Sequence, residues 1–174
     1  MKLRITEKSA WTGLLYEVSI DGDAASFTGA EIYRDRFPAN IALRPESVQQ
    51  LKDATSFLEL EQWRDSYRPE DVGSVVDDGG SWNCVLDVTG SIMRSAGDNA
   101  FPSYSSPSTT SLHEERFGLL RESVFAAIKL SVPYGCHAGQ TKAEQGVAPQ
   151  SATRSESNPE GSDTPQPESE ARSR

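Results

Sequence analysis

The sequence has few cysteines, few aromatic residues and no long apolar run, and each shortage argues against a class of protein. Only two of its 174 residues are cysteines, Cys84 and Cys136. Small disulfide-stabilised secreted domains carry many more cysteines at closer spacing. No stretch approaches the roughly 20 apolar residues that a membrane-spanning helix requires, and the N-terminus lacks the apolar segment of a secretory signal. We therefore expect a cytoplasmic protein with free thiols.

Positive charge is also scarce. The chain has 17 lysines and arginines against 26 aspartates and glutamates, which gives a formal net charge of −9. Binding to a nucleic-acid backbone or to an anionic membrane surface depends on clustered basic residues, and the sequence contains no such cluster. We expect neither nucleic acid nor a membrane as a partner, and we expect any partner to be another protein.

The apolar residues are concentrated in the first three quarters of the chain. All aromatic residues except Tyr134 lie before Pro133, and Val147 is the only large apolar residue after Gly135. A segment so poor in apolar side chains cannot offset the entropy lost on folding. The sequence therefore predicts one domain over residues 1–134, followed by a disordered polar tail over residues 135–174.

Apolar periodicity predicts an α+β domain, in which an antiparallel sheet of about five strands has helices packed on one face. Alternation of apolar and polar residues indicates strands over residues 1–7, 14–20, 25–27, 82–88 and 92–95. Helical spacing follows Pro45 as far as Arg68, either as one helix or as two that meet near Thr55. A second helix follows a capping box at Ser111 and Glu114. Residues 29–44 are irregular and indicate a loop or a weak strand.

Three short motifs lie in the middle of the chain: W-x-x-x-Y from Trp63 to Tyr67, D-G-x-x-W from Asp78 to Trp82, and G-x-N-A-x-P from Gly97 to Pro102. This pattern resembles that of small uncharacterised bacterial α+β proteins, in which a helix, a hairpin and a closing helix follow in that order. The resemblance covers roughly residues 43–130 and implies the fold, but it implies no chemistry. Asp77, Gly80 and the long loop over residues 103–110 depart from the pattern.

Four carboxylates lie on or beside the predicted hairpin: Asp77, Asp78, Asp87 and Asp98. Two of them paired as acid and base would suit a hydrolase, as in glycoside hydrolysis. The other interpretation is that aspartates beside glycine or asparagine stabilise their own turns. Asp87 lies on the strand face opposite Trp82, which we expect to face solvent. We favour the structural interpretation.

The aromatic residues of the same region have two interpretations, a ligand groove or a core between helix and sheet. They are Trp63, Tyr67, Trp82, Phe101 and Tyr104. We favour the core. If they are buried, the indole N–H of Trp82 and the hydroxyl of Tyr67 need hydrogen-bond partners, and Asp78 or Asn99 would serve.

The sequence offers no recognisable cofactor or metal site. Cys84 lies on the predicted buried face of its strand, whereas Cys136 and His137 lie at the start of the predicted tail. No glycine-rich phosphate-binding motif is present. We therefore expect no cofactor and assign no catalytic or metal-binding residue.

Two hypotheses about function remain. The first is a non-catalytic domain that acts through protein–protein contact, as an accessory or immunity-type protein does. The alternative is a hydrolase or small-ligand enzyme that uses the carboxylates between Asp77 and Asp98. The candidate functional surface is the same for both: Asp78, Trp82, Asp87, Asp98 and Asn99.

Overall fold

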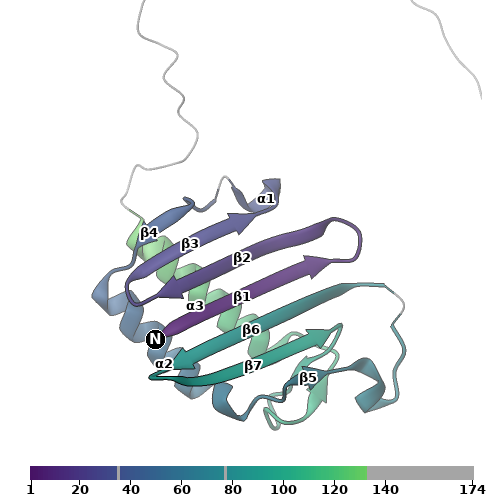
Figure 1. Ribbon diagram of the computed structural model, residues 1–174. Helices are drawn as coiled ribbons and strands as arrows, with labels where there is room; N and C mark the ends of the chain where they lie inside the picture. The colour runs from purple at the N-terminus through teal and green to yellow at the C-terminus, as the bar shows by residue number, and fades with distance from the viewer. Residues whose placement is uncertain (35, 77, 133–174) are drawn as a thin grey trace, which may run out of the picture. The chain divides into compact units, whose positions relative to one another are not determined.

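The computed structural model describes residues 1–34, 36–76 and 78–132. They form an α+β domain in which a seven-stranded sheet carries its helices on one face (Figure 1). The predicted fold class is therefore confirmed. The predicted tail, the domain end at residue 134 and Asp77 lie outside the described residues.

The main sheet has the strand order β4-β3-β2-β1-β6-β7-β5, and every neighbouring pair is antiparallel except β5 and β7. Its strands are β1 (Lys2–Ser9), β2 (Gly13–Asp21), β3 (Ala24–Gly29), β4 (Asn40–Ala42), β5 (Ser66–Tyr67), β6 (Gly80–Val88) and β7 (Ser91–Asp98). A separate pair consists of β8 (Phe101–Pro102) and β9 (Thr110–Ser111). The five predicted strands are all present. The two additional strands of the main sheet, β4 and β5, are too short to show an alternating pattern.

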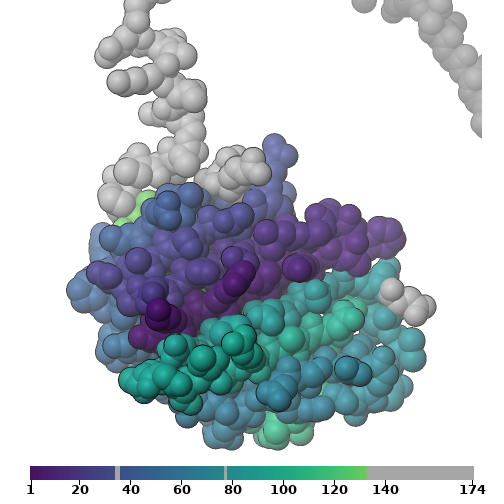
Figure 2. Space-filling view, viewed as in Figure 1, coloured from purple at the N-terminus to yellow at the C-terminus, as the bar shows by residue number. Residues whose placement is uncertain are grey.

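Of the described helices, the two longest lie behind the sheet in the view of Figure 1, and the shortest lies beyond the end of β3. The described helices are α1 (Glu31–Arg34), α2 (Pro45–Phe57) and α3 (Glu115–Ser131), with short 3-10 turns at η1 (Leu60–Gln62) and η2 (Pro69–Val72). The predicted second helix corresponds to α3, whose apolar residues at helical spacing, Phe117, Leu120, Val124 and Ile128, are all fully buried. It packs against the inner face of the sheet, where Ile5, Tyr16 and Cys84 are also fully buried. The opposite, outer face, which faces the viewer in Figures 1 and 2, has no helix of the described residues over it.

The helical segment predicted as far as Arg68, as one helix or as two that meet near Thr55, contains a single α-helix, which ends much earlier. It stops at Phe57, and Glu59 takes a left-handed backbone conformation with φ of 54°. The spacing of Phe57, Leu60, Trp63 and Tyr67 matches a helical period, but Phe57 is 77% exposed while the other three are buried. The predicted capping box is also wrong. The Ser111 hydroxyl donates to the Glu115 carboxylate, and α3 begins without a side-chain cap.

The aromatic residues of the motifs form a core, as the sequence predicted. Trp82 stacks on Phe117 with ring centroids 4.6 Å apart and contacts Trp63, Tyr67 and Phe101. Tyr104 is the exception because it is 57% exposed.

The partners predicted for the polar atoms of these aromatics are wrong. The Trp82 indole N–H donates to the Ala100 carbonyl oxygen at 2.8 Å, and the Tyr67 hydroxyl donates to the Pro107 carbonyl oxygen. Asn99 instead accepts a hydrogen bond from the Gly80 backbone N–H at 2.8 Å. The acceptors for Trp82 and Tyr67 are therefore backbone carbonyl oxygens in loops and not the predicted side chains. No local sequence pattern indicates which carbonyl accepts each hydrogen bond.

Replacing Gly97 with alanine is expected to destabilise the fold by about 2–4 kcal/mol, because a Cβ there would collide with the Trp82 indole and the Ala100 carbonyl oxygen. Gly118→Ala is the matched control. Its added Cβ has the Glu114 Cβ at 3.6 Å as its nearest neighbour, so we expect a gain of up to about 1 kcal/mol. Urea unfolding of the two variants measures both values. Similar stabilities would contradict the role of Gly97.

Candidate functional site

The hairpin carboxylates do not form one cluster. Asp87 lies next to the β6–β7 turn, and its Oδ1 accepts a hydrogen bond from the Gly90 N–H at 2.9 Å. Asp98 lies opposite Ser81, at the other end of the hairpin. Positions 81 and 87 are six residues apart along β6, which corresponds to about 20 Å. Asp78 is exposed and precedes β6, at the Asp98 end.

Trp82 and Asn99 stabilise the fold, and both also lie beside hollows on the protein surface. Trp82 is 3% exposed and belongs to the core. Asn99 has φ of 50°, and its side chain holds the turn before β6 through the Gly80 N–H. Both residues line the floor of two adjoining hollows at this end of the sheet.

The more apolar of these hollows we call the Trp11 depression. It has a volume of about 480 Å³ and lies between the β1–β2 turn, the segment that leads into β6, and the loops that flank β8 and β9. Its apolar lining consists of Trp11, Leu15, Val76, Trp82, Phe101 and Leu112. Of these, Trp11, Val76 and Leu112 are exposed. Contiguous apolar patches on the surface of a monomer are candidate interaction sites.

Local hydrogen bonds hold Trp11 at the rim of the depression. The Ala10 N–H donates to the Gly79 carbonyl oxygen at 2.6 Å, which joins the β1–β2 turn to the turn before β6. The Trp11 N–H donates to the Ser9 hydroxyl at 3.2 Å. The side chain nevertheless remains 79% exposed. The β1–β2 turn projects beyond the rest of the sheet (Figures 1 and 2).

A charged network joins β1 to α3, and its two carboxylates, Glu7 and Glu114, line the depression. Arg121 contacts the Glu7 carboxylate at 3.1 Å and the Glu114 carboxylate at 2.7 Å. The Tyr16 hydroxyl donates to Glu7 at 2.7 Å. Burial, and then the neighbouring Glu7, raise the pKa of Tyr16 far above its ordinary value. Burial alone would lower the pKa of Arg121, but Glu7 and Glu114 outweigh it and raise that pKa.

The adjoining hollow, of about 550 Å³, is more polar. It shares Val76, Ser81, Trp82 and Asn99 with the Trp11 depression, and Arg68, Glu70 and Asp98 contribute its charged lining. Two carboxylates against one guanidinium leave this hollow with a negative formal charge. The candidate residues Trp82, Asp98 and Asn99 therefore lie together at this end of the hairpin, whereas Asp87 does not.

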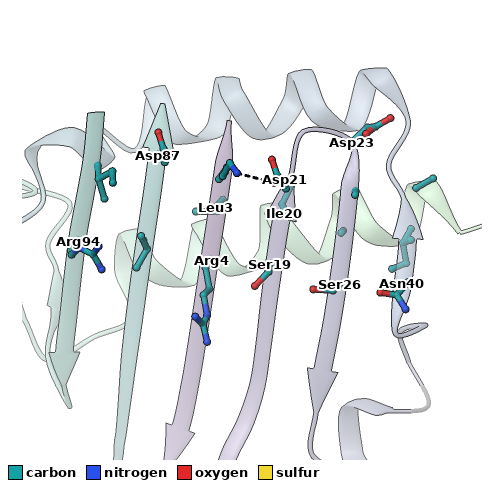
Figure 3. Close-up of a pocket in the computed structure, with 17 residues that line it drawn as sticks. Leu3, Arg4, Ser19, Ile20, Asp21, Asp23, Ser26, Asn40, Asp87 and Arg94 are labelled. Atoms are coloured by element: carbon teal, nitrogen blue, oxygen red, sulfur yellow. Dashed lines mark ion pairs between the residues drawn. The ribbon is translucent and has the colours of Figure 1, made fainter. Parts of the chain in front are cut away.

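A further hollow, of about 710 Å³, lies on the outer face of the sheet (Figure 3). One row across the strands carries Asn40, Ser26, Ser19, Arg4, Val85 and Arg94, as the strand pairing shows. The lining as a whole has three cations, at Lys2, Arg4 and Arg94, and three carboxylates, at Asp21, Asp23 and Asp87. It has no aromatic residue and no net formal charge, so it resembles an ordinary solvated sheet face.

Among the described residues, no group of three or more histidine, cysteine, aspartate or glutamate side chains is placed to hold a metal ion. None of the described helices combines the length and apolar character needed to cross a membrane. Cys84 is fully buried, as the sequence predicted. Comparison with known proteins finds no matching family model, no similar curated protein and no similar solved structure.

Most residues of this surface have no signature in the sequence. Trp11 had a usable signal, because a large aromatic residue in a turn between two alternating segments has no core to enter. The pair of Glu7 and Arg121 had none, since 114 residues separate them. Only the packing of α3 on β1 brings these two side chains together.

Replacing Glu7 with glutamine is expected to lower the free energy of unfolding by about 1–2 kcal/mol, because Arg121 and Tyr16 lose a half-buried charged acceptor. Glu17→Gln is the control, since it breaks the more exposed ion pair with Arg4 and should cost at most about 0.5 kcal/mol. Chemical denaturation followed by tryptophan fluorescence measures both. Equal effects would show that the network adds no more than a surface ion pair.

Burial raises the pKa of the Cys84 thiol to about 12. In a Cys136→Ser chain, whose only thiol is Cys84, we expect alkylation at pH 8 to be at least about a hundredfold slower in the native protein than in denaturant. Mass spectrometry of iodoacetamide-treated samples measures the ratio. Rapid labelling of the native chain would mean that Cys84 is accessible and ionisable.

Proposed function

We propose that this protein is a non-catalytic protein-binding domain and that the Trp11 depression is its binding surface. One observation carries the proposal: Trp11, Val76 and Leu112 are all exposed and all line the same hollow. Large aromatic side chains such as tryptophan dominate the energetics of protein interfaces, because they bury much area at little entropic cost. The turn that carries Trp11 is already fixed by the hydrogen bond from Ala10 to Gly79, which limits the entropy lost on binding.

The charge of the adjoining hollow favours a basic partner, whereas the depression itself is lined by Lys8 and by Glu7 and Glu114, which pair with Arg121. Glu70 and Asp98 line the adjoining hollow, and the exposed Asp78 precedes Gly79. The chain as a whole carries a formal charge of −9. Complementary charge of this kind accelerates association and selects among partners more than it raises affinity. The partner we infer presents an apolar side chain surrounded by lysine or arginine.

The enzyme alternative receives less support from the geometry. Asp87 is engaged with the turn at Gly90 and lies about 20 Å along the hairpin from the Asp98 end. The two carboxylates of the depression, Glu7 and Glu114, both pair with Arg121. Such an arrangement suits the attachment of α3 to the sheet better than acid–base chemistry.

Affinity capture from the native cells with the full chain tests the proposal. Trp11→Ser is expected to weaken binding of a specific basic protein by at least about tenfold. Phe57→Ser is the matched control, because Phe57 is 77% exposed, nearly as much as Trp11, yet does not line the depression. Far-ultraviolet circular dichroism confirms that both variants fold.

Three results would contradict the proposal. The first is that wild type and Trp11→Ser capture the same proteins. The second is that Phe57→Ser loses the same partner as Trp11→Ser. The third is that no protein is captured while a small molecule or metal ion copurifies. The last result would favour the enzyme alternative.

A further inference from the structure

We propose that the open edge of β7, at Ile92 and Arg94, accepts an extended segment of a partner protein as an additional strand. This edge lies at the end of the hairpin away from the Trp11 depression, because Ile92 pairs with Asp87 whereas the depression contains Ser81. The inference therefore goes beyond the proposed function and does not depend on that surface.

The strand pairing shows which backbone groups are available. β7 pairs with β6 from Ser91 to Asp98, but on its other side β5 pairs only with Ala96 and Gly97. The Ala96 N–H points away from β6, since it donates to the Asp65 carbonyl oxygen at 3.1 Å. Backbone groups of alternate residues point the same way in an antiparallel strand. The N–H and C=O groups of Ile92 and Arg94 therefore also face away from β6.

No strand in the described part of the chain pairs with this side of β7 before Ala96. Ile92 is 55% exposed, and Arg94 is exposed as well. In Figure 3, the strand that carries Arg94 borders the outer hollow, which extends from it across the sheet to Asn40. Four backbone groups in a row fit one kind of occupant, which is another extended backbone.

Space for alternate side chains of such a segment exists on both faces of the sheet. On the outer face, Ile92 and Val85 offer apolar contacts beside Arg94. On the inner face, a hollow of about 540 Å³ contains Leu60, Leu86 and Val88. Leu86 pairs with Met93, and Val88 pairs with Ser91, so this hollow borders β6 beside the open part of β7, although none of its lining residues belongs to β7 itself. The segment that fits is extended and apolar at alternate positions.

The other edge of the sheet is less suited to strand addition. β4 has only three residues, and the chain turns directly from it into α2. The edge of β7 has neither a proline nor more than one charged side chain from Ser91 to Ser95, which are the usual means of blocking an edge. A second copy of the chain could also pair there, but two chains of charge −9 repel each other.

Amide hydrogen exchange of the full chain, followed by NMR, tests the inference. The probe is a pool of capped hexapeptides in which valine, isoleucine or leucine alternates with threonine. In the free protein, the Ile92 and Arg94 amides are expected to exchange rapidly, while the neighbouring Met93 amide, which bonds to β6, is protected. The pool at millimolar concentration should slow exchange of the two edge amides at least about tenfold.

Two variants at one position separate backbone pairing from side-chain contact. Arg94→Pro removes the outward N–H without breaking a bond to β6, because proline is tolerated on the free side of an edge strand. It should weaken peptide binding about fivefold to tenfold. Arg94→Ala keeps the N–H and should bind nearly as the wild type does. Trp11→Ser should also bind the peptides normally, so this test fails or succeeds independently of the proposed function.

Several results would overturn the inference. One is that the peptide pool leaves the exchange rates of the Ile92 and Arg94 amides unchanged. Another is that folded Arg94→Pro and Arg94→Ala variants bind the peptides equally tightly. Protection of the two amides in the peptide-free monomer would show that the chain itself covers the edge. Protection that rises with protein concentration would assign the edge to a second copy.

Discussion

The hydrogen bond from the Trp82 indole to the Ala100 carbonyl oxygen determines how the β6–β7 hairpin packs against the loop that follows it and against α3. It places the Trp82 ring against Phe117 of α3, and it requires the chain to reverse tightly after β7. Gly97 and the left-handed Asn99 make that reversal possible. Asn99 in turn holds Gly80, where β6 begins. One buried donor thus connects the hairpin, the loop that follows it and the closing helix.

This constraint has a consequence for function. The motifs at Asp78–Trp82 and Gly97–Pro102 are the most distinctive part of the sequence, and their residues are largely occupied by the fold itself. A distinctive motif is often taken as a sign of catalysis, yet a buried indole with a single acceptor is equally demanding of its surroundings. Asp78 is exposed, but the apolar side chains free to contact other molecules lie outside the motifs, among them Trp11, Val76 and Ile92.

Much of the fold was predictable because it depends on local periodicity. The alternation of Leu3 and Ile5, and the stripe from Phe117 to Ile128, each report a face that is buried. The predicted helix boundary was wrong where the backbone conformation of a single residue decides whether a helix continues. The left-handed conformation of Glu59 ends α2, although the apolar spacing continues past it. The site was harder to predict, since the contact of Glu7 with Arg121 and the hollow around Trp11 exist only after distant segments pack.

The one-sided covering of the sheet explains why the two proposed binding surfaces lie at its margins. The outer face carries equal numbers of cations and carboxylates in its hollow, and two of these pair directly, Lys2 with Asp21. Such a face satisfies its own charges and offers a partner little free energy. At the margins the sheet is incomplete: backbone groups of β7 face outward, and the β1–β2 turn carries an aromatic side chain that the core cannot contain. Backbone groups without a hydrogen-bond partner and exposed aromatic side chains contribute the most free energy when a partner covers them.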